Sequence, residues 1–89
     1  MELIVKGSFY RDIAHYNDKQ LLNAVNIIVN QVEKAPQISK ISNLKKLKQF
    51  STLYRIKVAN QYRIGVVIRT NKIWFVCFGH RNSFYKRFP

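Results

Sequence analysis

The stretch LYRIKVANQYRIGVVIRTNKIWFVCFG, residues 53 to 79, alternates apolar and polar side chains with a period of two. Such alternation is typical of β-strands, and polar turns divide the stretch into LYRIKVA, YRIGVVIRT and KIWFVCFG. Strands that follow one another this closely usually pair as antiparallel neighbours. The stretch therefore predicts a three-stranded antiparallel meander.

The loop between the first two strands fixes how they pair. A three-residue loop, residues 59 to 61, sets Ile56 opposite Ile64 and Lys57 opposite Arg63. A two-residue loop would mix apolar and basic side chains on each face, and we discard it because that slip would bury cations. The first hairpin is therefore expected to have one apolar and one basic face.

The second hairpin is expected to turn at Asn71-Lys72, which suits a two-residue loop. This register pairs Arg63 with His80 and Gly65 with Phe78. It gathers basic side chains on one face near one end of the sheet: Arg55, Lys57, Arg63 and His80. The same face carries apolar side chains that we expect the chain's tail or a partner to cover: Val67, Trp74, Val76 and Phe78.

Upstream of the meander the sequence predicts a strand and two helices. ELIVK, residues 2 to 6, is typical of a short strand, and SFYRDIAHYN has apolar residues at helical spacing with Ser8 as its N-cap. The next helix begins at a capping box on Asn17, or at Asp18, and ends before Pro36. It carries one apolar stripe: Leu21, Val25, Ile28 and Val32.

This order of elements predicts a single α+β domain over residues 1–89. An N-terminal strand and a helical hairpin precede the antiparallel meander, and the helices pack on one face of the sheet. Residues 37 to 52 have little periodicity and are expected to form a connecting loop. The lysines of this loop are either solvated or form a basic rim for a phosphate backbone: Lys45, Lys46 and Lys48.

The charge balance points to a polyanionic partner. The chain has 16 Lys and Arg against four Asp and Glu, a net charge of +12. Such an excess favours nucleic acid, an acidic protein or an anionic membrane surface. Cys77 is the only cysteine, so neither an intramolecular disulfide nor a thiolate metal site is expected. MELIVKG is neither a signal peptide nor a membrane span, and we expect a cytoplasmic protein.

The residue types favour RNA cleavage without a metal or other cofactor. A two-metal nuclease needs several carboxylates, and the predicted register brings none to the basic cluster. RNA supplies its own nucleophile, the 2′-hydroxyl beside the phosphate. The protein needs only to accept that proton, stabilise the negative phosphate and protonate the leaving 5′ oxygen. Lys, His and Tyr can move protons, and Arg can hold the developing charge.

Residues 45 to 88, KKLKQFSTLYRIKVANQYRIGVVIRTNKIWFVCFGHRNSFYKRF, resemble the RelE/ParE toxin superfamily of bacterial type II toxin–antitoxin systems. LYRIKV, YRIGVVI and GHRNSFYK carry the resemblance, which implies a RelE-like fold. It also implies the properties of the RelE branch, whose members are small basic endoribonucleases. Most cut mRNA in the ribosomal A site, leaving 2′,3′-cyclic phosphate and 5′-hydroxyl ends, and a cognate acidic antitoxin wraps and blocks them.

The resemblance also assigns the site residues. It places RelE-type basic and phenolic positions at Arg55, Lys57, Arg63, Arg81 and Tyr85. Arg55 replaces a lysine of RelE itself, and arginine is a poor base. His80 replaces another RelE lysine, in a region where related toxins place a catalytic histidine.

Individual roles stay open within this set. Proton abstraction falls to Lys57 or His80, and phosphate stabilisation to Arg63 and Arg81. Arg55 would position the phosphate, and Tyr85 or His80 would serve the leaving group or stack on a base.

Two alternatives fit parts of the sequence. The ParE branch shares the fold, inhibits DNA gyrase and usually lacks the full basic and tyrosine set. A non-catalytic RNA-binding module would instead use exposed Trp74 and Phe78 as stacking platforms. The sequence leaves the oligomeric state open.

Overall fold

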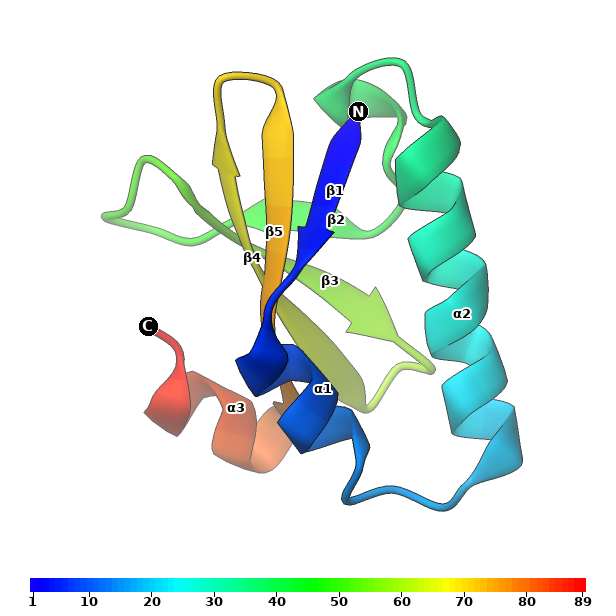
Figure 1. Cartoon of the computed structure of the whole chain (residues 1–89). Coiled ribbons are helices and arrows are strands. Elements are labelled where there is room, and N and C mark those ends of the chain that lie inside the picture. Colours follow the sequence, from blue (N-terminus) through cyan, green and yellow to red (C-terminus); the bar gives the residue numbers. More distant parts are fainter.

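The computed structural model describes all 89 residues as an α+β fold, which confirms the predicted class (Figure 1). Five strands form one sheet in the spatial order β1-β5-β4-β3-β2. The strands are β1 (Glu2–Val5), β2 (Leu44–Lys46), β3 (Leu53–Val58), β4 (Tyr62–Arg69) and β5 (Lys72–His80). The helices are α1 (Gly7–Ile13), α2 (Lys19–Lys34), the 3-10 helix η1 (Ile38–Lys40) and α3 (Arg81–Arg87). No helix combines the length and the apolar character that crossing a bilayer requires.

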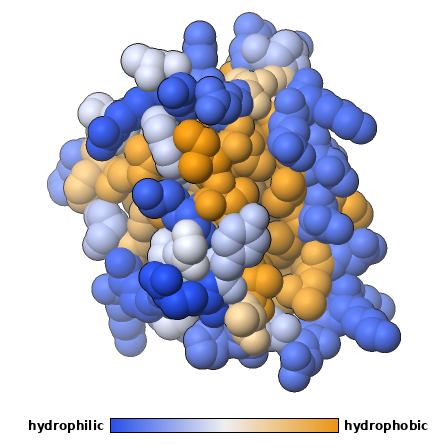
Figure 2. All heavy atoms as spheres, in the orientation of Figure 1, coloured by the Kyte–Doolittle hydropathy of each residue, from blue (hydrophilic) through white to orange (hydrophobic).

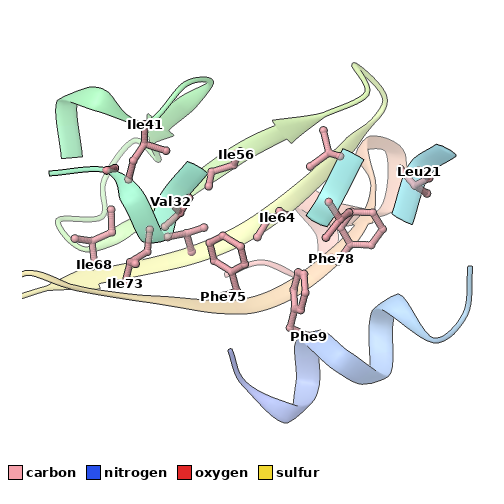
Figure 3. Close-up of a cluster of buried hydrophobic side chains, with 14 residues drawn as sticks. Phe9, Leu21, Val32, Ile41, Ile56, Ile64, Ile68, Ile73, Phe75 and Phe78 are labelled. Carbon is pink, nitrogen blue, oxygen red and sulfur yellow. The ribbon is translucent and has the colours of Figure 1, made fainter. Parts of the chain in front are cut away.

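The two N-terminal helices cover one face of the sheet, as predicted. Phe9 of α1 packs on Phe75 and Phe78 of β5, with ring centroids 5.5 Å and 6.2 Å apart (Figure 3). Leu21 and Val32 of the predicted α2 stripe are buried in the same cluster. This packing stabilises helices that are too short to persist alone.

The helix starts differ in part from the sequence prediction. Asp18 is the N-cap of α2, and its carboxylate accepts hydrogen bonds from the backbone N–H groups of Gln20 and Leu21 at 3.0 Å and 3.2 Å. The alternative capping box on Asn17 is therefore wrong. The prediction for Ser8 is also wrong, because α1 has no side-chain cap and the Ser8 hydroxyl donates to the backbone oxygen of Val76 in β5.

The first hairpin has the predicted register. Ile56 lies opposite Ile64, Lys57 opposite Arg63 and Arg55 opposite Gly65. The second hairpin differs, because its turn is Thr70-Asn71, both with positive φ. The predicted turn at Asn71-Lys72 is wrong.

A β-bulge shifts the second hairpin once more. The register changes between Gly65 and Val66, so Gly65 lies opposite Cys77 and Ile64 opposite Phe78. Phe78 is therefore 1% exposed in the core beneath the helices, and its predicted place on the basic face is wrong. The extra residue at a bulge lets a strand change which face its side chains occupy.

Three features at the sheet margins were not predicted. β1 pairs in parallel with β5, and β2 extends the sheet beyond β3. The segment from residue 37 to 52 is thus not only a loop, because it contains η1 and β2. The third feature is α3, which lies beside α1 at one end of the sheet (Figure 1).

The α3 helix packs on the sheet face opposite to α1 and α2. Phe84 of α3 and Phe88, which directly follows the helix, are buried, with 2% and 8% of their surface exposed. A Cβ atom on Gly65 would lie 3.0 Å from Cδ1 of Phe88, which shows how closely the Phe88 ring covers that glycine. The remainder of this face has no helix over it, and we call it the open face.

Candidate active site

A shallow basic groove lies where β2, β3 and α3 meet. Its volume is about 200 Å³. The lining residues are Lys45, Lys46, Leu47, Lys48, Arg55 and Tyr85. The structure therefore brings the three lysines of the predicted rim together with Arg55 and Tyr85, and we call this site the basic groove.

Backbone oxygens hold two of the groove cations in place. The Arg55 Nη1 donates to the Asn43 oxygen at 2.9 Å, and the Lys46 Nζ donates to the Leu47 and Phe50 oxygens at 3.2 Å and 3.0 Å. Lys45 lies opposite Arg55 across the β2–β3 pair. Both side chains therefore share the open face at the groove.

Arg63 and Tyr85 form the polar contact between the sheet and α3. The Arg63 Nε donates to the Tyr85 hydroxyl at 3.3 Å, and its Nη1 donates to the Asn60 and Tyr62 oxygens at 2.9 Å and 3.0 Å. Arg63 is 7% exposed and has no carboxylate partner. Its Nη2 has no hydrogen-bond partner in the protein and is not fully buried, which leaves this nitrogen free to donate.

Lys57 and Arg81 are neighbours of this contact in the strand register and along α3, but neither lines the basic groove. Lys57 is half-buried directly opposite Arg63 on β3. Arg81 is the exposed first residue of α3, one helical turn before Tyr85. Residues four apart share a helix face, so Arg81 and Tyr85 project from the same side of α3.

His80 does not join this group. It lies opposite Tyr62 rather than Arg63, with its ring 5.4 Å from the Tyr62 ring, so the predicted pairing is wrong. Its Nδ1 accepts a hydrogen bond from Asn82 N–H at 3.1 Å and caps α3. The other ring nitrogen contacts Gln61 Oε1 at 3.0 Å. The bulge, whose extra residue is Val76 earlier in β5, causes this change of face.

No carboxylate neutralises the groove. Glu2 contacts Lys72 at 4.0 Å, Asp12 pairs with Arg87, Asp18 caps α2, and Glu33 is exposed on that helix. No cluster of three or more His, Cys, Asp or Glu side chains could hold a metal ion. The site therefore offers cations and one phenol to a ligand, a set that suits a phosphate group.

A second contact anchors α3 from the helical side. Asp12 of α1 accepts hydrogen bonds from Arg87 Nη2 at 3.0 Å and from the backbone N–H of Phe78 at 2.9 Å. The Asp12 carboxylate raises the pKa of Arg87. Nearby, burial raises the pKa of the Cys77 thiol to about 11. No sequence pattern indicated the Asp12–Arg87 pair, because its partners are 75 residues apart.

Known proteins similar to the chain are RelE-type toxins. The chain is 28% identical over 90 residues to Toxin RelE3 of Methanocaldococcus jannaschii, with 100% of both sequences covered. It matches a chain in the crystal structure of the RelB-RelE antitoxin-toxin complex from Methanococcus jannaschii with a TM-score of 0.80 and 26% identity. That match covers 97% of this chain and 99% of that one.

A more distant match shares the fold alone. The YoeB dimer from Staphylococcus aureus gives a TM-score of 0.67 at 16% identity, with 86% of this chain and 92% of that chain covered. No family model matches the sequence. The chain is similar in sequence to Toxin RelE3 over its whole length and similar in fold to a chain of the RelB-RelE complex over 97% of its length, which confirms the resemblance to RelE seen in its strand and tail motifs.

Proposed function

We propose that the chain is the toxin of a type II toxin–antitoxin system and a metal-independent endoribonuclease. Its substrate would be mRNA in the ribosomal A site, which implies a cytoplasmic site of action. The observation that carries this proposal is the hydrogen bond between Arg63 and Tyr85 beside a groove of unneutralised cations. RelE-like sequence and fold support the same reading.

The phenol of Tyr85 is suited to protonate the leaving 5′ oxygen. Its oxygen already accepts a hydrogen bond from Arg63 Nε, so its own hydrogen is free to be donated. Its ring is 51% exposed, so it is also accessible for stacking on a base. We assign it the general acid role and keep base stacking as a second contribution.

Lys57 is our candidate to accept the 2′-hydroxyl proton. It faces Arg63 across the strand pair, whereas His80 is turned toward Tyr62. Arg63 Nη2 and Arg81 would stabilise the charge on the pentacoordinate phosphate, because guanidinium groups donate paired hydrogen bonds to phosphate oxygens. Arg55 and the three groove lysines would hold the flanking backbone.

An acidic antitoxin is the expected protein partner. The chain with the TM-score of 0.80 comes from a complex with the antitoxin RelB. An apolar hollow of about 380 Å³ lies between α1 and α2, and its lining includes Phe9, Leu22 and Val29. Figure 2, in the orientation of Figure 1, shows hydrophobic atoms (orange) in the middle of this face of the molecule, with hydrophilic atoms (blue) on both sides. A partner with an apolar stripe and acidic flanks would suit this hollow on a chain of net charge +12.

The test is expression of the chain alone in bacteria, followed by mapping of 5′-hydroxyl RNA ends. We expect growth arrest and new ends inside translated frames, both absent from an Arg81→Ala/Tyr85→Phe variant that still folds. Arrest without new ends would overturn the nuclease and point to a ParE-like action on gyrase. RNA binding without cleavage would leave a non-catalytic RNA-binding module.

A further inference from the structure

An apolar stripe crosses four strands on the open face of the sheet. Ile4 of β1 lies opposite Trp74 of β5, Trp74 opposite Val67 of β4, and Val67 opposite Leu53 of β3. All four side chains are half-buried, although neither α1 nor α2 packs on this face. We call this row the Trp74 stripe.

Free cations flank the tryptophan. Lys6, Arg69 and Trp74 line a hollow of about 200 Å³ together with Val67 and Val76. Neither Lys6 nor Arg69 forms an ion pair, because the two ion pairs of the chain are Lys72–Glu2 and Arg87–Asp12. A half-buried indole between unpaired cations is suited to a ligand that is both aromatic and anionic.

The Trp74 stripe lies on the same face as the basic groove. Trp74 is two strands from Arg55 and one same-face step further along the sheet, a separation of roughly 12 Å from ordinary strand geometry. Phe88 covers Gly65 between the two sites. The predicted covering of Trp74 by the chain's tail does not occur there, because the tail packs on Gly65 and Cys77 instead.

We propose that the Trp74 stripe binds single-stranded RNA, with one base stacked on Trp74 and adjacent phosphates held by Lys6 and Arg69. This proposal rests on the proposed RNA-directed function and adds a second contact outside the cleaved phosphate. Sheet surfaces that combine an aromatic side chain with flanking cations read unpaired bases in this way. An acidic protein segment could satisfy the cations, but it would not need an aromatic platform.

Trp74 is the only tryptophan of the chain, so its fluorescence reports on this site alone. The Arg81→Ala/Tyr85→Phe chain would be titrated with a single-stranded 2′-O-methyl RNA, which lacks the nucleophile. Inorganic polyphosphate and poly-glutamate would serve as anions without bases. We expect the RNA to quench Trp74 emission and the two other polymers to leave it unchanged.

Substitutions then measure the contribution of the ring. In the same background, Trp74→Leu should weaken RNA binding by about tenfold, the lower part of the range for one stacked base. Trp74→Phe should restore most of the affinity while keeping the cavity filled. Lys6→Gln and Arg69→Gln should each reduce the salt dependence of binding by about one phosphate contact. Circular dichroism would verify that each variant folds.

The outcomes separate this proposal from the nuclease. If RNA binding depends on Arg55, while RNA does not change Trp74 emission and Trp74→Leu does not change the affinity, the Trp74 contact is overturned. The proposed function would be unaffected by that result. Quenching by polyphosphate as well would overturn base stacking, and a response to poly-glutamate alone would indicate a protein partner instead. Quenching by RNA without any cleavage in cells would support the platform and overturn the nuclease.

Discussion

Replacing Gly65 by alanine should displace α3 and thereby Tyr85, the proposed general acid. The new Cβ would stand 3.0 Å and 3.1 Å from Cδ1 and Cε1 of Phe88, and closer still to Sγ of Cys77. The glycine has no unusual backbone φ, so the cost is steric. Overpacking of this kind costs about 1 to 3 kcal/mol. Phe88 follows directly on a helix of seven residues and should move before the sheet does.

The size of the effect follows from how weakly α3 is held. Phe84 and Phe88 supply most of its buried apolar surface, each contributing roughly 1.5 to 3 kcal/mol before the cost of ordering the helix. A loss of about 1.4 kcal/mol raises the ratio of undocked to docked helix tenfold. Cleavage follows the docked fraction of α3, which falls from about 90% to about 50% for a helix docked by about 1.4 kcal/mol, so we expect Gly65→Ala to lower RNA cleavage by roughly twofold. Trypsin should also cut faster after Lys86 and Arg87.

Gly79→Ala is the matched control for this experiment. Gly79 lies in β5 and is buried, as Gly65 is in β4. A Cβ atom on Gly79 would lie 3.8 Å from its nearest atoms, Arg87 Nη1 and Ser83 Oγ, which is an ordinary contact distance. It should keep cleavage and trypsin resistance near those of the unaltered chain. If Gly65→Ala did the same, the packing of Phe88 would not position Tyr85.

Three other predictions test separate parts of the structure. Tyr85→Phe should lower the cleavage rate by roughly 10² to 10⁴ with little change in RNA affinity, as expected for loss of a general acid; equal losses in both would contradict that role. Asp12→Asn should reduce cleavage severalfold by freeing Arg87, whereas Glu2→Gln, at an exposed pair, should change nothing measurable in the same assay. Because burial raises the pKa of Cys77 to about 11 from 9.0, only the unfolded chain loses this proton between those values. The free energy of unfolding of the unaltered chain, from urea titrations, should thus fall over that pH range by more than that of the Cys77→Ala variant. Parallel plots of unfolding free energy against pH for the two proteins would refute the raised pKa.

The sequence predicted the first hairpin because a wrong register there carries a clear penalty. A slip by one residue would move Arg63 and Lys57 to the core face of the sheet, among aliphatic side chains beneath the helices. The second hairpin has apolar residues on both faces, so several registers bury similar apolar area. Nothing in the alternation marks the bulge at Gly65, and the predicted position of Phe78 was wrong for that reason.

The groove was predicted as a set of residue types, while its assembly depends on contacts distant in sequence. β2 has three residues and gains its stability from pairing with β3, so its own sequence has no strand pattern. The tail forms α3 because Phe84 becomes buried against the sheet and the Phe88 ring covers Gly65. These contacts bring Tyr85 to Arg63, and local propensity does not report them.

The site can assemble only late in synthesis, because β1 and α1 contact β5 and α3, which are the last elements to be made. Arg87 follows Asp12 by 75 residues, so at ordinary translation rates of about 5 to 20 residues per second their pair forms roughly 4 to 15 seconds later. During that interval the residues of α1 and α2 have been made, but the chain has neither α3 nor a lined groove. If the proposed activity holds, the growing chain has no assembled cleavage site during this interval and cannot cut the mRNA of the ribosome that makes it. A partner that folds together with the residues of α1 and α2 could bind before the groove exists.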